Sequence, residues 1–315
     1  MYDKDSKGIS WSAGFFMLIC FVFAGAIAAA MLFQSIWTGM TGKPIEEITG
    51  SSITASDGNA LRIGQVIYSL VSFLLPALIS AHIMNRNPLN LLGYNNRFTS
   101  KQLALVPLIL FSAIFFSGSL AWLNEMIPVT QSMKATFDKM EADYTKQSEA
   151  ILGLKTTGDY IISVLILGLL PAVCEETLFR GGLQNFLSRW TKNPWISIVV
   201  VALIFSAVHF SFYGFLPRAF LGMMLGAIYY YSGSLWVSIS AHFLNNLIAI
   251  TAMYIMKMNG KPPADILGGQ DVRWYGILAL PVFLGLLIYF KKISPPPVKT
   301  SPVDELLNEN DTHGI

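Results

Sequence analysis

Long apolar stretches separated by short polar segments run along most of this chain. Most of them approach the roughly 20 apolar residues that a transmembrane helix requires. The stretches that qualify lie near Trp11–Trp37, Leu61–Met84, Gln102–Leu123, Tyr160–Phe186, Trp195–His209, Leu216–Tyr231, Ser234–Met256 and Trp274–Phe290. Tryptophans near several of the ends suit the membrane interface, where amphipathic rings are favoured. The pattern predicts an all-α, polytopic transmembrane helical bundle of about eight spans.

The first stretch is interpreted as a span rather than as a cleaved signal peptide. Its leader mixes Asp3 and Asp5 with Lys4 and Lys7, and the apolar run continues past any cleavage point. An even number of spans puts both termini on one side. Lys and Arg are more frequent on that side once the long loop before Tyr160 is set aside, which predicts cytoplasmic termini.

The composition supports a membrane protein and excludes several other classes. Of the 315 residues, 53% are hydrophobic and 13% are charged, against roughly 25% charged residues in soluble domains. A net charge of +2 without a dense basic run argues against a nucleic-acid partner. Cys20 and Cys174 lie in apolar stretches and are too few for a disulfide framework or a zinc finger.

The long loop before the fourth stretch has a helical pattern of its own. Met133, Phe137, Met140 and Tyr144 recur at helical spacing among charged residues, which predicts an amphipathic helix. One interpretation is an interfacial lid beside a membrane site. The other, which the sequence favours, is an amphipathic helix packed on the end of the bundle.

The fourth stretch carries three charged side chains inside an apolar helix. Insertion scales put each such group at about 2.5–3.5 kcal/mol at the helix centre, so these charges need compensation. Glu176 and Arg180 are four residues apart and share a helix face, which predicts an ion pair. Glu175 points about 100° away and is left without this partner.

Two histidines lie deep in other apolar stretches. His209 ends the fifth stretch, while His242 and Asn246 share one face of the seventh. If these helices adjoin the fourth, Glu175, His209, His242 and Asn246 form one polar cavity in the membrane. A carboxylate in low dielectric is a better general base, and His and Asn are suitable donors to an oxyanion. The set predicts activated-water attack on a carbonyl.

The same residues also fit a metal-dependent reaction. Glu175, His209 and His242 could equally be three ligands of a catalytic zinc with an open fourth position. The chain has no His-Glu-x-x-His helix to strengthen that view. From residue types and spacing alone, metal-dependent and metal-free hydrolysis are therefore equal alternatives, and a Cys174 thiol nucleophile is a weaker one.

Three short motifs resemble the signature of a known family, the CPBP family of CAAX proteases and bacteriocin-processing enzymes. The motifs are Glu175-Glu176-x-x-x-Arg180, Phe205-x-x-x-His209 and His242-x-x-x-Asn246. The resemblance covers roughly Tyr160 to Met256, and no motif position departs from the pattern. It implies an eight-helix membrane bundle and leaves metal use open, since the family is described in both ways.

The resemblance also implies roles for individual residues. Glu175 matches the catalytic glutamate, and His209 matches the histidine that helps it to activate water. His242 and Asn246 match the pair that stabilises the oxyanion. Glu176 and Arg180 match a structural ion pair.

These observations together predict an intramembrane endopeptidase acting on a membrane-associated, CAAX-like or lipidated protein or peptide. The alternative is a non-hydrolytic membrane protein: a bacteriocin-immunity factor, a scaffold or an ion-coupled transporter. We expect a multi-pass protein of a bacterial inner membrane. We expect residues 1–158 to form a three-span region with the amphipathic helix, 159–256 the catalytic core, 257–292 the last loop and span, and 293–315 a disordered tail.

Overall fold

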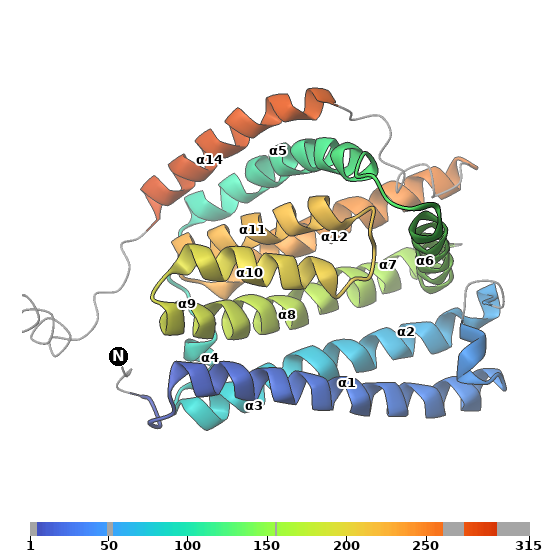
Figure 1. Cartoon of the computed structure of the whole chain (residues 1–315), viewed down its shortest axis with the longest axis horizontal. Coiled ribbons are helices and arrows are strands. Elements are labelled where there is room, and N and C mark those ends of the chain that lie inside the picture. The colour runs from blue at the N-terminus through green and yellow to red at the C-terminus, as the bar shows by residue number, and fades with distance from the viewer. Residues whose placement is uncertain (1–4, 49–52, 155, 261–273, 295–315) are drawn as a thin grey trace, which may run out of the picture.

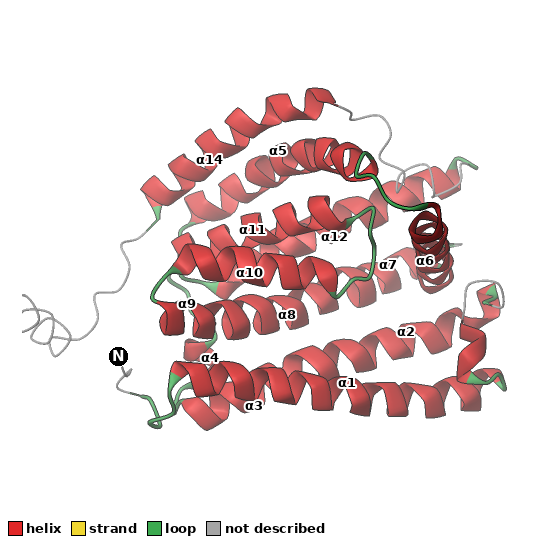
Figure 2. Ribbon diagram, viewed as in Figure 1, coloured by secondary structure: helices red, strands yellow, loops and turns green. Residues whose placement is uncertain are grey.

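The computed structural model of the protein describes residues 5–48, 53–154, 156–260 and 274–294. Its elements are helices, most of which run along one common direction while α6 crosses them, and no strand occurs in these ranges (Figure 1, Figure 2). The predicted all-α bundle is therefore confirmed. The predicted tail falls almost wholly on residues 295–315, which lie outside the described ranges, as does most of the predicted loop after Met256.

The helices follow one another along the chain with short connections. The first half contains α1 (Trp11–Thr41), α2 (Gly58–Ile67), η3 (Tyr68–Leu74), α3 (Leu75–Met84), α4 (Pro88–Leu91), α5 (Ser100–Glu125) and α6 (Gln131–Leu152). The second half contains α7 (Thr157–Ser163), η4 (Val164–Leu169), α8 (Leu170–Glu176), η5 (Thr177–Gln184), α9 (Asn185–Thr191), α10 (Pro194–Ala207), α11 (Phe215–Ser232), α12 (Leu235–Met258), η6 (Trp274–Leu278) and α14 (Ala279–Ile293). Several of these labels are consecutive parts of one continuous helix.

Six helices in the described ranges are long and apolar enough to cross a membrane. They are Trp11–Thr41, Gly58–Met84, Ser100–Glu125, Thr157–Thr191, Leu235–Met258 and Trp274–Ile293. The chain is thus an integral, multi-pass membrane protein. The other two expected spans form α10 and α11, which have only 14 and 18 residues and are not among the six. The count of eight spans is therefore not confirmed.

The outer face of the bundle is covered with large apolar side chains. Phe23 of α1, Phe111 of α5 and Ile288 of α14 are 67%, 61% and 68% exposed. Many exposed apolar side chains of this size are unfavourable in water and favourable against lipid. Both ends of the described chain lie at the same end of the bundle, where α9 and α4 also lie (Figure 1).

Two long helices change their winding at a proline. Pro76 and Pro171 each occupy the second residue of an α-helical segment that directly follows a π-helical one, η3 and η4. A proline inside an α-helix lacks an N–H and clashes with the carbonyl of the preceding turn. The wider π turn accommodates that ring, and it leaves carbonyl groups without their usual helical partners.

A third π segment, η5, begins directly after Glu176 and contains Gly181. A Cβ on Gly181 would lie 2.7 Å from the carbonyl oxygen of Leu92 and 3.2 Å from its Cβ. Leu92 is fully buried, so its backbone has little freedom to move away. The absence of a side chain at Gly181 therefore allows the helix that carries the charged motif to approach the segment after α4.

Replacing Gly181 with alanine is expected to destabilise the protein by about 1–3 kcal/mol, because the new methyl group overpacks this contact. The unfolding midpoint of purified protein in detergent measures the effect. Gly39→Ala is the matched control, since a Cβ on Gly39 of α1 meets no atom within 4 Å. There the better helix propensity of alanine leaves stability unchanged or raises it. Equal midpoints for the two variants would contradict the prediction.

Candidate active site

The four residues predicted to act in catalysis line one cavity. Glu175 comes from α8, His209 from the turn after α10, and His242 and Asn246 from α12. The cavity measures about 440 Å³, and most of its remaining wall is apolar, with Phe73, Leu167, Phe179, Ile250 and Met253 among the lining residues. The structure thus brings together polar side chains that are far apart in the sequence.

Glu176 and Arg180 form a buried ion pair beneath this cavity. Arg180 Nη1 lies 3.0 Å from Glu176 Oε1, and the two side chains are 1% and 0% exposed. Arg180 Nη2 also donates a hydrogen bond to the carbonyl of Gly222, which ties the pair to α11. The guanidinium lies 4.8 Å from the ring centroid of Phe205, a cation–π contact. The pair predicted from the four-residue spacing is therefore present.

His242 lies between the two glutamates. Its Nδ1 is 2.9 Å from Glu176 Oε1, and its Nε2 is 3.9 Å from Glu175 Oε2. An ionised carboxylate only accepts hydrogen bonds, so Nδ1 carries the proton and donates to Glu176. Glu176 thus fixes the orientation of His242 and leaves Nε2 directed at Glu175.

His209 is oriented by a backbone carbonyl four residues earlier in the chain. Its Nδ1 lies 2.7 Å from the carbonyl oxygen of Phe205, which only accepts, so Nδ1–H is the donor. In the neutral ring, Nε2 is then the free acceptor. The Phe205 ring packs edge-on against both His209 and His242, with centroid distances of 5.0 and 5.9 Å. One aromatic ring therefore spaces the two histidines.

Asn246 is held by carbonyl groups of the π segment η4. Its Nδ2 lies 3.4 Å from the carbonyl oxygens of both Leu167 and Gly168. Pro171 has no N–H, so it cannot donate the usual helical hydrogen bond to the carbonyl of Leu167, four residues earlier. The proline-induced distortion therefore contributes to positioning the amide.

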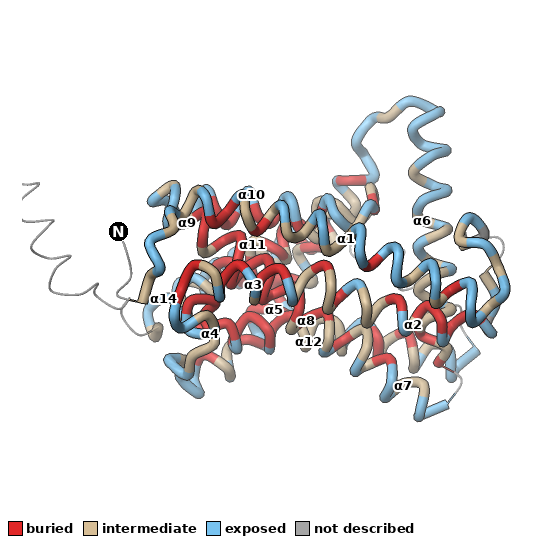
Figure 3. The backbone as a smooth tube through the Cα atoms, turned by 90° about the horizontal axis from the view of Figure 1, so that it is seen from below, coloured by how far each residue is buried: buried red, intermediate tan, exposed pale blue. Residues whose placement is uncertain are grey.

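The predicted amphipathic helix exists as α6 and forms one wall of the cavity. Tyr144, Gln147, Ser148, Ile151 and Leu152 of α6 line it together with the four polar residues. The N-terminal half of α6 stands away from the body of the protein and is largely exposed (Figure 3). The helix therefore contacts the site directly, as the lid interpretation expects, and does not only cover the bundle end.

The candidate zinc ligands Glu175, His209 and His242 all line this cavity. In the described ranges, no group of three or more His, Cys, Asp or Glu side chains is placed to hold a metal ion. Nδ1 of both His209 and His242 is engaged, by Phe205 and Glu176, so Nε2 of each ring is the nitrogen that a metal would bind. Whether the protein uses a metal stays a prediction that metal analysis can decide.

The structure also shows contacts that the sequence interpretation did not include. Glu176 was expected only to pair with Arg180, and its hydrogen bond to His242 was not expected. Phe205 was noted as a motif position without a role. A third addition is Arg218 of α11, whose charge interacts electrostatically with both Glu175 and His209. Its cationic type within an apolar stretch was the available sign in the sequence.

Comparisons with known proteins agree with this site. Residues 157–248 match the family model described as type II CAAX prenyl endopeptidase Rce1-like. The chain is 35% identical over 85 residues to the uncharacterized protein YpbD of Bacillus subtilis (strain 168), covering 26% of this chain and 40% of that relative. It is 32% identical over 92 residues to an uncharacterized 24.3 kDa protein of Escherichia coli, covering 28% and 42%. No solved structure is significantly similar.

The matched segments span less than half the length of these two relatives. The family match contains all three motifs, from Glu175 to Asn246, and excludes α6. The resemblance inferred from the motifs is therefore confirmed for residues 157–248, which match the Rce1-like model of type II CAAX prenyl endopeptidases.

Proposed function

We propose that this protein is an intramembrane endopeptidase that hydrolyses a peptide bond of a membrane-associated protein or peptide. The observation that carries the proposal is the convergence of Glu175, His209, His242 and Asn246 on one cavity with apolar walls. Such walls suit an apolar or lipidated segment next to the scissile bond, as in a CAAX-like substrate. The family match of residues 157–248 supports the reaction class.

In the proposed reaction, Glu175 acts as the general base. A water molecule held by Glu175 and by Nε2 of His209 loses a proton to the carboxylate as its oxygen attacks the peptide carbonyl carbon. The C=O bond becomes a single bond, and a tetrahedral oxyanion forms. Glu175 then returns the proton to the leaving amine as the C–N bond breaks, which releases two peptides.

His242 and Asn246 are proposed to stabilise the oxyanion. The Asn246 amide has N–H donors, and its orientation is set by the carbonyls of η4. Nε2 of His242 donates only when the ring carries both protons. In that form Arg180 and His242 together balance the charges of Glu175 and Glu176. Donors preorganised in an apolar cavity are worth more than the same donors in water.

The proposal is tested by comparing peptide termini in membranes with and without the protein. Vesicles that contain the purified protein are incubated with a bacterial membrane fraction, and new termini are identified by mass spectrometry. We expect new termini within or beside apolar or lipidated segments. Their complete absence would favour the non-hydrolytic alternative, a scaffold, an immunity factor or a transporter.

The role of a metal is tested separately. Because Glu175 and His209 activate the water without a metal in the proposed reaction, we expect purified protein to contain well below one zinc per chain and to stay active in a chelator. Inductively coupled plasma mass spectrometry measures the metal. Close to one zinc per chain, lost in His209→Ala, would overturn the expectation and make these residues metal ligands.

A further inference from the structure

The catalytic-site residue His209 lies on a turn that helix α6 holds from outside. We call residues 208–214, between α10 and α11, the histidine turn. We propose that Phe137 and Glu141 of α6 are positioning residues for His209, because they fix the histidine turn. They lie outside residues 157–248, so the family match does not assign them a role.

The contacts between α6 and the histidine turn are specific. The rings of Phe137 and Phe212 stack with centroids 4.2 Å apart and an interplanar angle of 4°. Ser211 Oγ donates a hydrogen bond of 2.9 Å to Glu141 Oε2. In the first half of α6, residues 131–136 and 138–140 are exposed, whereas Phe137 and Glu141 are partly buried. The two partly buried residues of this half are therefore those that contact Phe212 and Ser211.

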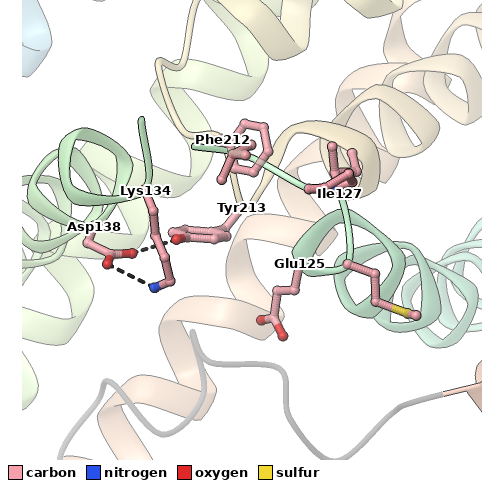
Figure 4. A pocket seen from close by; sticks show the side chains of 9 residues that line it. Glu125, Ile127, Lys134, Asp138, Phe212 and Tyr213 are labelled. Atoms are coloured by element: carbon pink, nitrogen blue, oxygen red, sulfur yellow. Dashed lines mark hydrogen bonds and ion pairs between the residues drawn. The ribbon is translucent and has the colours of Figure 1, made fainter. Parts of the chain in front are cut away.

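A third contact joins Asp138 to Tyr213, next to the stacked pair (Figure 4). Tyr213 donates its hydroxyl proton to Asp138 Oδ1 over 2.5 Å, and Lys134 pairs with the other oxygen of the same carboxylate. The hydrogen bond raises the pKa of Tyr213 to about 12, so the hydroxyl keeps its proton. A cavity of about 570 Å³ lies beside these side chains. The contact between α6 and the turn is therefore made by a few individual side chains and is not closely packed.

The histidine turn has features that require external support. Phe210, next to His209, has φ of +51°, a left-handed conformation that is unfavourable for a residue with a side chain. Such strain persists only where surrounding contacts hold it. Helix α10 ends at Ala207, so His209 is not carried by a regular helix.

Charge on the inner side of the turn complements Glu141 on the outer side. Arg218 Nη1 is buried and has no hydrogen-bond partner in the described chain. A Cβ on Gly214 would lie 2.9 Å from both Arg218 Nη2 and Ser211 Oγ, so the guanidinium and the serine lie close together at the turn. A carboxylate hydrogen-bonded to Ser211 is thus placed in a positive field, which favours the docked arrangement.

The opposite end of α6 is firmly anchored, which makes the helix a rigid support. Arg62 of α2 donates hydrogen bonds to the carbonyls of Ile151 and Leu152, at 2.8 and 3.1 Å, and forms an ion pair with Asp159 at 3.2 Å. Because α6 is one continuous helix between this anchor and Phe137, its attachment to α2 determines where it contacts the histidine turn.

Hydrogen exchange of the full-length protein in lipid nanodiscs tests the coupling without requiring activity. We expect Phe137→Ala and Glu141→Ala to speed amide exchange in residues 208–214. Glu141→Gln keeps an acceptor oxygen for Ser211 but loses the negative charge near Arg218, so its exchange should lie between that of the wild type and that of Glu141→Ala. Lys139→Ala, at an exposed position of the same helix, is the matched control and should change nothing. Unaltered exchange of the turn in both alanine variants would overturn the inference.

Kinetics supply the second arm, which rests on the proposed proteolysis. Misplacement of a catalytic group by about 1 Å costs up to about a hundredfold, so kcat of Glu141→Ala should fall roughly ten- to hundredfold with KM nearly unchanged. A rise in KM alone would overturn the positioning role and make α6 a substrate-binding element. A wild-type protein that cleaves nothing contradicts the proposed function, whereas the exchange arm still decides the coupling.

Discussion

Replacing Glu175 with glutamine is expected to abolish hydrolysis while the protein stays folded. Glutamine has the same shape, but its amide cannot take the proton of the attacking water. Removing a general base costs about 10²–10⁴-fold in rate, and within the described chain no other carboxylate lines the cavity to replace it. The contact of Glu175 with Nε2 of His242 is 3.9 Å long, beyond hydrogen-bond distance, so the loss of the carboxylate charge should cost little stability.

The measurement is the cleavage rate of the substrate found by the termini analysis, together with the amount and unfolding midpoint of the purified variant. Glu46→Gln, which changes an exposed glutamate outside the cavity, is the matched control and should keep full activity. Full activity in Glu175→Gln would show that another group accepts the proton. A variant that does not accumulate would show that Glu175 is a structural charge.

The bundle itself was predictable because a membrane imposes simple rules. A run of about 20 apolar residues has few structural solutions other than a spanning helix. All six long helices therefore lie where the hydrophobic pattern placed them, from Trp11–Thr41 to Trp274–Ile293. The pattern does not reveal π segments, since these depend on how Pro76 and Pro171 are accommodated among neighbouring helices.

Part of the site followed from spacing within single helices. The ion pair of Glu176 and Arg180 required only that four residues make about one turn. The position of His242 between Glu175 and Glu176 depends instead on the rotation of α12 against α8, which no pattern within one helix determines. Geometry between helices was therefore the missing information.

His209 illustrates a different limit. The fifth apolar stretch was expected to be helical through His209, but α10 ends at Ala207 and the chain turns. Apolar composition shows where a chain is buried and not where a helix stops. The turn after α10 places His209 in the same cavity as Glu175.

Replacing Glu176 with alanine is expected to have the largest effect on stability. The change leaves the Arg180 guanidinium buried at 1% exposure without its carboxylate, and it frees Nδ1 of His242. Removing one partner of a buried ion pair costs about 3–5 kcal/mol, because the remaining charge is uncompensated. We expect the variant to accumulate poorly and to unfold at a clearly lower temperature in detergent than Glu175→Gln.

A double variant separates the charge effect from general disruption. Replacing both partners, as in Glu176→Gln with Arg180→Met, removes the uncompensated charge and should recover much of the lost stability. It should not recover hydrolysis, since the glutamine side chain would present no carboxylate to His242. A loss of stability of less than about 1 kcal/mol in Glu176→Ala would contradict the prediction, because so small a loss is below the cost of an unpaired buried charge. Such a result would mean that Glu176 has no structural role. We propose instead that Glu175 carries the acid–base chemistry and that Glu176 supports both Arg180 and His242.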